Sequence, residues 1–87
     1  MIEAIQVSVP GYGNLTGNPV TIVKLMKAAK FEDMVHISDD AYMDHTQGEI
    51  ARLYGKHIEF SGDTEADRAE SFLKSLAENG LIKIEKV

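Results

Sequence analysis

The sequence has no cysteine among its 87 residues and no long uninterrupted run of apolar residues. Without cysteine, the chain cannot form disulfide bonds, thiolate zinc sites or cysteine nucleophiles, so packing must hold the fold together. A membrane-spanning helix needs roughly 20 consecutive apolar residues, and residues 1–3 lack the basic character of a secretory signal. We therefore expect a cytoplasmic protein with no membrane association.

Basic side chains are scarce, with nine Lys and Arg against 14 Asp and Glu, for a formal net charge of −5. An acidic chain repels the phosphate backbone, so nucleic acid is not an expected partner. The charge is also uneven: residues 32–50 contain six acids and no Lys or Arg, while residues 1–31 contain three lysines and one acid. With 44% apolar and 26% charged residues, residues 1–87 should form one globular domain.

Two hydrophobic periodicities alternate along the chain and predict a mixed α+β fold. Strands are expected where apolar and polar residues alternate, over residues 2–9, 34–38, 41–43 and 56–61; residues 81–87 also alternate and allow an extra C-terminal strand. Helices are expected where apolar residues recur every three or four positions, over residues 19–30, 46–55 and 65–79. The order β-α-β-β-α-β-α predicts a two-layer open-faced sandwich, in which a four-stranded antiparallel sheet carries three helices on one face.

Turn and capping residues set the boundaries of two of these expected elements. Asn18 suits the N-cap, and Pro19 the first position, of the helix over residues 19–30. The pair Asp39 and Asp40 suits the turn of a hairpin between the second and third expected strands.

Thr46 opens the pattern Thr-Gln-Gly-Glu, which matches a helix capping box. As a cap, its hydroxyl would accept an N–H of the first helical turn and contribute about 1 kcal/mol. As a phosphorylation site, it would carry a dianion at a helix N-terminus, where the helix dipole favours negative charge. The two roles do not exclude each other.

Three glycines, Gly11, Gly13 and Gly17, lie in the loop expected before the first helix. Backbone N–H groups and the helix dipole favour an anion at such a place. The spacing is one residue away from the dinucleotide-binding pattern, however, and no nucleotide P-loop is present. The glycines therefore serve either an anion site or only the turn.

A candidate partner surface lies beside this loop. Val20, Lys24 and Lys27 share the outer face of the helix expected over residues 19–30. An exposed valine beside two lysines is also common on surfaces that bind nothing.

The histidines match no metal-binding pattern. His36, His45 and His57 are 9 and 12 residues apart, and the acids before His45 are expected to form a solvated hairpin. No serine lies in the context of a nucleophile elbow. We expect no metal, no cofactor and no hydrolytic catalysis.

The chain resembles the HPr phosphocarrier family of the bacterial sugar phosphotransferase system over nearly its whole length. HPr proteins have the element order expected here and a motif H-x-R-P, whose histidine receives phosphate from enzyme I. In the corresponding stretch of this chain, Pro19 matches the motif proline, whereas Thr16 stands at the position of the histidine and Asn18 at that of the arginine. Thr46 stands at the position of the family's regulatory serine.

The resemblance implies a degenerate HPr-like member that binds proteins instead of carrying phosphohistidine. Its partners would be proteins of the phosphotransferase system or of transcriptional regulation, docked on the helix over residues 19–30 and on the second helix through Gln47. A threonine phosphate is an ester and a poor phosphoryl donor. Two alternatives stay open: a true carrier with another acceptor, His45 or His57, and an unrelated small anion-binding α+β domain.

We predict that the wild-type chain accepts no acid-labile phosphate from enzyme I and phosphoenolpyruvate, because Thr16 has no imidazole and Asn18 has no positive charge. Intact-mass analysis after incubation, with an ordinary HPr as positive control, measures this. A base-stable, acid-labile adduct on any histidine would contradict a purely regulatory role.

Overall fold

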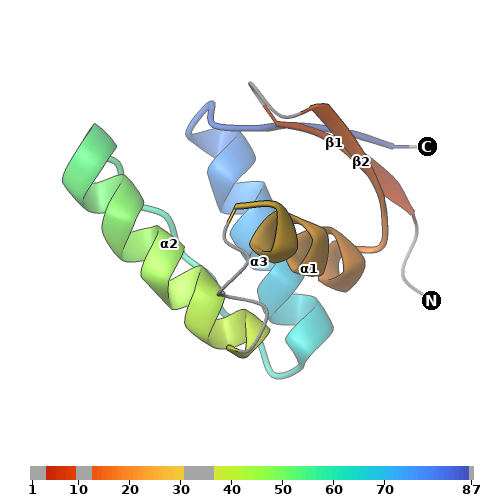
Figure 1. Cartoon of the computed structure of the whole chain (residues 1–87), viewed down its shortest axis with the longest axis horizontal. Helices are drawn as coiled ribbons and strands as arrows, with labels where there is room; N and C mark the ends of the chain where they lie inside the picture. Colours follow the sequence, from red (N-terminus) through yellow and green to blue (C-terminus); the bar gives the residue numbers. More distant parts are fainter. Residues whose placement is uncertain (1–3, 10–12, 31–36, 87) are drawn as a thin grey trace.

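The computed structural model describes residues 4–9, 13–30 and 37–86 (Figure 1). Its elements in chain order are β1 (Ile5–Val9), β2 (Gly13–Gly17), α1 (Pro19–Lys30), α2 (Asp39–Tyr54), α3 (Glu65–Glu78) and β3 (Lys83–Lys86). The expected class, α+β with three helices and an antiparallel sheet, is confirmed. In the described ranges, however, the sheet has three strands where four were expected.

All three helices lie on one side of the sheet (Figure 1). α1 and α3 pack against each other, α1 also against β2 and α3 also against β3. α2 packs on α1 and α3, farther from the sheet than they are. The molecule therefore has a sheet, a middle tier of two helices and one outer helix.

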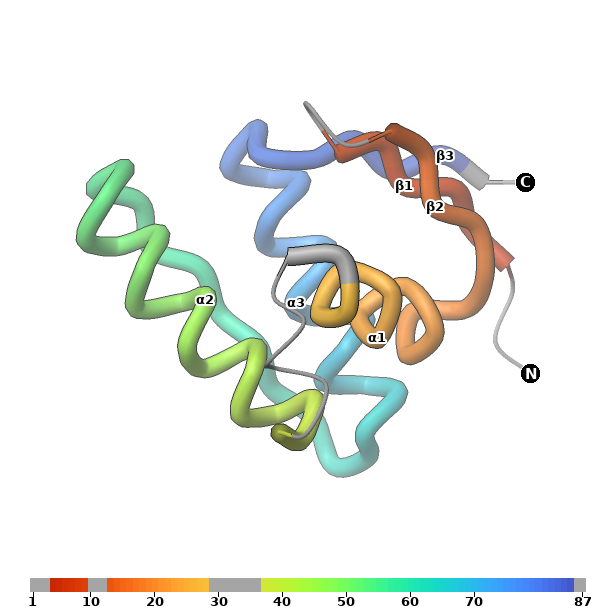
Figure 2. Tube along the Cα trace, in the orientation of Figure 1, coloured from red at the N-terminus to blue at the C-terminus, as the bar shows by residue number. Residues whose placement is uncertain are grey.

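β1 is the central strand, with β2 on one side and β3 on the other (Figure 2). Both neighbours run antiparallel to it, and Val7 of β1 lies opposite Leu15 of β2 and Ile84 of β3. Because side chains alternate between the faces of a strand, these three residues share the face that meets the helices. Val7 is completely buried there.

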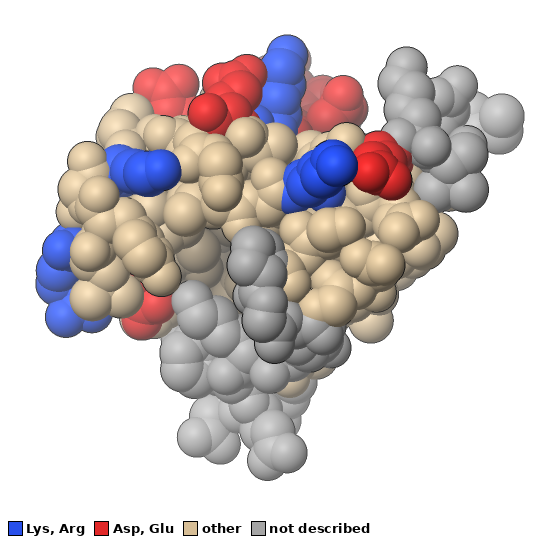
Figure 3. All heavy atoms as spheres, turned by 90° about the horizontal axis from the view of Figure 1, so that it is seen from above, with Lys and Arg blue, Asp and Glu red and all other residues tan. Residues whose placement is uncertain are grey.

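The other face of the sheet is polar. Its side chains belong to the alternate positions of the three strands: Gln6, Ser8, Asn14, Thr16, Lys83 and Glu85. Figure 3 looks down on this side of the molecule and shows acidic and basic side chains scattered among uncharged ones. The expectation that one sheet face meets water is confirmed.

Phe72 of α3 lies at the centre of the core and is completely buried. Its ring meets Tyr42 of α2 edge-on, with centroids 6.3 Å apart, and meets Phe60 in the same way at 6.2 Å. Edge-to-face contacts of this kind add about 1 kcal/mol to the burial itself. One ring thus joins α2, α3 and the segment between them.

The glycine loop expected before α1 is wrong in part, because residues 13–17 form β2. Gly13 and Gly17 are the two ends of this strand and have positive φ angles of 126° and 152°. Glycine adopts such angles without steric cost but is rare inside strands, so its presence favoured a loop prediction. Pairing with β1 overrides that preference. Gly11 lies outside the described residues.

The hairpin expected around Asp39 and Asp40 is wrong, because both acids lie in the first turn of α2. Ser38 is the N-cap of this helix, and its hydroxyl oxygen accepts the N–H of Ala41 at 3.1 Å. The positive end of the helix dipole favours the two carboxylates at this place. Residues 34–36 of the preceding expected strand lie outside the described ranges.

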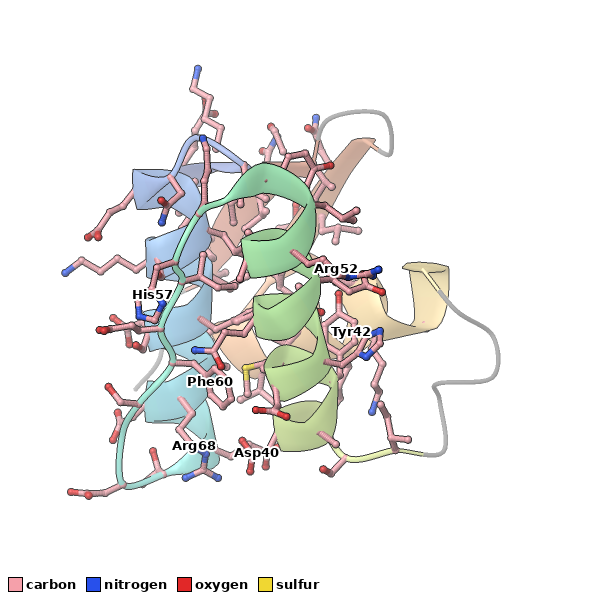
Figure 4. The ribbon with its side chains drawn as sticks, turned by 90° about the vertical axis from the view of Figure 1, so that its left-hand side faces the viewer. Asp40, Tyr42, Arg52, His57, Phe60 and Arg68 are labelled. Carbon is pink, nitrogen blue, oxygen red and sulfur yellow. The ribbon has the colours of Figure 1, made fainter. Side chains whose placement is uncertain are left out.

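The strand expected over residues 56–61 is also wrong, although its alternation is real. Ile58 is completely buried and Phe60 is half-buried, while His57, Glu59 and Ser61 are exposed. The segment nevertheless pairs with none of the strands in the described ranges. It runs between α2 and α3 (Figure 4) and buries its apolar side chains against those helices.

Side chains of the neighbouring helices replace the missing strand partners of this segment. The N–H groups of Glu59 and Ser61 donate to the hydroxyls of Ser75 and Ser71, two residues one turn apart on α3. From α2, the amide of Gln47 donates to the carbonyl of Ile58 at 2.7 Å. In a sheet, neighbouring strands would pair with these backbone N–H and C=O groups; here side chains of α2 and α3 pair with them.

Three other expectations are confirmed. α1 begins with Asn18 as N-cap, whose side chain accepts the N–H of Thr21 at 2.9 Å. α3 covers the expected range to within one residue and is capped by Thr64. Residues 83–86 pair with β1 of the same chain, which settles the placement of this C-terminal strand.

Thr46 and Ser38 together test where α2 begins. Thr46 is only 4% exposed in the middle of α2, and its hydroxyl makes no hydrogen bond of standard geometry among the described residues. Its polar neighbour is the hydroxyl of Tyr42, whose pKa is raised by burial and lowered in part by this contact. A buried hydroxyl without a well-formed hydrogen bond costs about 1–3 kcal/mol, so Thr46→Val should leave stability unchanged or raise it by about 1 kcal/mol. Ser38→Ala should lower it by about 1 kcal/mol through loss of the cap. Urea unfolding with equal m-values measures both.

A helix beginning at Thr46 would produce the opposite ranking. The valine would then remove the cap and cost about 1 kcal/mol, while Ser38→Ala would have almost no effect.

Candidate functional site

Residues 16–19, the stretch that the sequence analysis aligned with the HPr motif, lie at the end of β2 and the start of α1. Thr16 is exposed on the polar sheet face opposite Gln6, and Gly17 ends the strand. The side-chain oxygen of Asn18 is already used as the cap of α1, and Pro19 is buried. The structure thus leaves Thr16 and Asn18 exposed close to each other in the chain, and the side chain of Asn18 occupies part of the helix N-terminus.

The two lysines of the expected partner surface bind a carboxylate of α2. Lys27 donates to Oδ1 of Asp39 at 2.8 Å and to the carbonyl of Ile37 at 2.8 Å. Lys24 donates to Oδ2 of the same carboxylate, also at 2.8 Å, and lies 3.8 Å from Glu65 of α3. The Asp39 side chain is 5% exposed and that of Lys27 is 10% exposed. Lys27 is therefore committed to the interior of the fold.

Hydrogen bonds from the two lysines decide the ionisation of Asp39. Burial by itself would raise the pKa of the carboxyl, but the hydrogen bonds from Lys24 and Lys27 outweigh it and lower the pKa to about 2. The hydrogen bond to Asp39 likewise raises the pKa of Lys24. The carboxylate therefore stays charged over the whole physiological range.

A second ion pair joins α2 to α3 beside the first. The guanidinium of Arg68 donates from Nε to Oδ1 of Asp40 at 2.8 Å and from Nη2 to Oδ2 at 3.0 Å (Figure 4). This paired geometry is stronger than a single contact, and the hydrogen bond raises the pKa of Arg68. Two adjacent acids thus fix the N-terminus of α2 to both of the other helices.

The remaining residues of the expected surface are less accessible than the sequence suggested. Val20 is half-buried, and Gln47 is half-buried with its amide bound to Ile58. The hydroxyl of Thr46 points into the interior, so a kinase would not reach it in this arrangement. The structure does not bring Gln47 and the lysines together as one open face.

The described histidines contact carboxylates on their own segments. His45 lies 2.9 Å from Glu49 one turn along α2, and His57 lies 3.2 Å from Glu59. Within residues 4–9, 13–30 and 37–86, no group of three His, Cys, Asp or Glu side chains could hold a metal ion. His36 lies outside the described residues.

A different surface, at the C-terminal end of α2, was missed by the sequence analysis. We define the α2 end as residues 51–57, all of which are exposed. Leu53 and Tyr54 are each 62% exposed, whereas Ile50 one turn earlier is buried. The positions three and four residues after a buried residue continue its stripe on a helix, so Leu53 and Tyr54 extend the core-facing stripe beyond its cover.

The α2 end is also basic. Its charged residues are Arg52 and Lys56, accompanied by His57, and it contains no acid. Figure 4 shows Arg52 and His57 at the same end of α2 on opposite sides of it, far from Asp40 and Arg68 at the other end. The sequence carried part of the signal, because the apolar stripe continues to the last turn before Gly55 and the cations Arg52 and Lys56 lie beside that turn in the chain.

No helix in the described ranges combines the length and the apolar character that crossing a membrane requires. Comparisons of the chain with protein-family models, curated proteins and solved structures find no match. The interpretation of the site therefore depends on its geometry.

We predict that Asp39→Asn lowers the free energy of unfolding by about 3 kcal/mol at pH 7, because it leaves the buried ammonium of Lys27 without its counter-charge. Asp44→Asn, a change on the exposed side of the same helix, should have an effect below about 0.5 kcal/mol. Urea unfolding of the three proteins measures the difference, and equal losses would show that the Asp39 pairs contribute nothing specific.

The same carboxylate should control the acid stability. Its pKa is near 3.8 when unfolded and about 2 when folded, so its contribution of about 2 kcal/mol is present above pH 4 and is lost as the pH falls towards 2. Unfolding midpoints of wild type and Asp39→Asn should therefore converge between pH 4 and 2.

Proposed function

We propose that the chain is a non-enzymatic protein-binding module whose partner docks on the α2 end. The observation that carries this proposal is the exposure of Leu53 and Tyr54 at the end of a stripe that is buried everywhere else along α2. Covering an apolar side chain of this size stabilises a complex by about 1–2 kcal/mol. Two such residues on adjacent positions give a partner a compact apolar anchor.

The charged clusters support a binding role over catalysis. Asp39, Asp40 and Arg68 are paired with residues of the same chain in geometries that hold helices together. A catalytic acid or base needs to face a site that a substrate can reach. Asp39 is instead enclosed between two lysines.

Within the class of proteins that the sequence resembles, the chain would be a regulatory HPr-like member and not a carrier, with phosphotransferase-system or transcription-regulatory proteins as partners. The threonine and asparagine at positions 16 and 18 support this view. The fold supports it less, since the HPr order needs residues 56–61 within the sheet, and they lie on α3. The binding role rests on the α2 end and does not require this family relation.

A photo-crosslinking residue in place of Tyr54 tests the proposal in the organism that makes the protein. We expect one discrete protein adduct at position 54 and none when the same residue replaces Thr16, which is also exposed but lies on the polar sheet face. Adding Leu53→Ser should remove the adduct without unfolding the chain, as checked by circular dichroism. No adduct at position 54, or equal adducts at both positions, would refute the proposal.

A further inference from the structure

We propose that the occupant of the α2 end is an amphipathic helix of a partner protein with an acidic rim around its apolar stripe. This inference rests on the proposed function and adds the chemical class of the partner. Two observations support the inference: the positive charge of residues 51–57, and the position of these residues at the end of a helix that lies away from the sheet edges.

The charge at this end is opposite to that of the rest of the molecule. The chain has a net charge of −5, yet residues 51–57 carry two cations, one histidine and no acid. Arg52 and Lys56 flank Leu53 and Tyr54 in the sequence, so the apolar anchor lies in the one exposed stretch of α2 that carries net positive charge. An acidic partner is repelled by most of the surface and attracted here, which orients it on approach.

Nearby groups moderate this field without reversing it. Lys56 donates to the carbonyl of Asn79 at the end of α3, and His57 contacts Glu59, which lies just beyond the α2 end. The Glu49 side chain, one turn before Arg52, is 19% exposed and contacts His45. Exposed Glu78 precedes Asn79 at the end of α3, and neither Arg52 nor Lys56 forms an ion pair among the described residues.

The placement favours a helix over an extended peptide. Strand addition needs an unpaired sheet edge, and the outer edges of this sheet belong to β2 and β3. These strands are separated from α2 by the tier of α1 and α3 (Figure 1). A second helix can cover the apolar stripe of α2 if apolar residues recur every three or four positions along that second helix.

A second copy of the chain fits less well. A symmetric pair through the α2 end would bring Arg52 and Lys56 of one copy close to the same residues of the other. Like charges facing each other across an interface destabilise it. The partner should therefore supply the carboxylates that this surface lacks.

Two synthetic helical peptides of about 18 residues test the inference on the full chain. Both carry the same leucine stripe, with glutamate at the remaining positions of one and lysine at those of the other. By calorimetric titration, we expect the glutamate peptide to bind at least about tenfold more tightly than the lysine peptide, with affinity falling as salt rises. Equal affinities, or no binding of the glutamate peptide, would refute an acidic partner.

Variants locate the binding on the surface. Leu53→Ser and Arg52→Glu should each lower the affinity for the glutamate peptide at least about tenfold. Arg52→Glu should raise the affinity for the lysine peptide. Leu25→Ser is the matched control, because Leu25 is a 41% exposed leucine on α1. Equal weakening by Leu25→Ser and Leu53→Ser would show binding to any exposed leucine and would overturn the inference.

Sedimentation and mapping of the crosslinked partner separate the two proposals. If the free chain self-associates in sedimentation and Leu53→Ser abolishes this, the occupant of the α2 end is a second copy of the chain and not a partner helix. An adduct from position 54 that maps to a segment without acidic residues would overturn the acidic helix and leave the binding role standing. Absence of any adduct would remove both.

Discussion

The carboxylate of Asp39 accepts a hydrogen bond from each of two lysines of α1, and the fixed position of α2 depends on this contact. Lys27 binds the carbonyl of Ile37 at the same time, so one ammonium group holds both the start of α2 and the residues that lead into it. Asp40, the next residue, binds Arg68 of α3. Removing water from such charges is costly, and their mutual hydrogen bonds offset that cost.

These contacts all lie at the N-terminal end of α2, and the C-terminal end of the helix is held less firmly. The polar contacts from α2 to the rest of the chain are strongest at its first turn and continue to Gln47, which binds the carbonyl of Ile58. Ile50 is the last residue of the helix that is buried. The last turn of α2 beyond it lies away from α1 and α3 (Figure 2), and Leu53 and Tyr54 in that turn are exposed. α2 is therefore anchored at one end and exposed at the other, and the exposed end is the surface that we propose for docking.

The sequence predicted those elements whose local signals agree with their tertiary role. α1 has a cap, a first-position proline and an apolar stripe, and α3 has a cap and a complete stripe, so both helices were predicted nearly to the residue. β2 was not predicted, because Gly, Asn and Thr favour loops and only pairing with β1 makes them a strand. The strand predicted over residues 56–61 was wrong for a different reason. Alternation shows that one side of a segment is buried, but it does not show whether a strand or a helix buries that side.

The candidate site could be predicted only in part for a related reason. The uneven charge along the chain was visible, with lysines in residues 1–31 and acids in residues 32–50, but each group was interpreted as a separate solvated surface. In the fold they are two halves of one contact, because Lys24 and Lys27 meet Asp39. That contact encloses Lys27, whereas Lys24 keeps a 57% exposed side chain, and the two most exposed large apolar residues of the described chain, Leu53 and Tyr54, lie at the α2 end. The ion pairs that hold the fold thus explain why the lysines of α1 do not form the open surface that the sequence suggested.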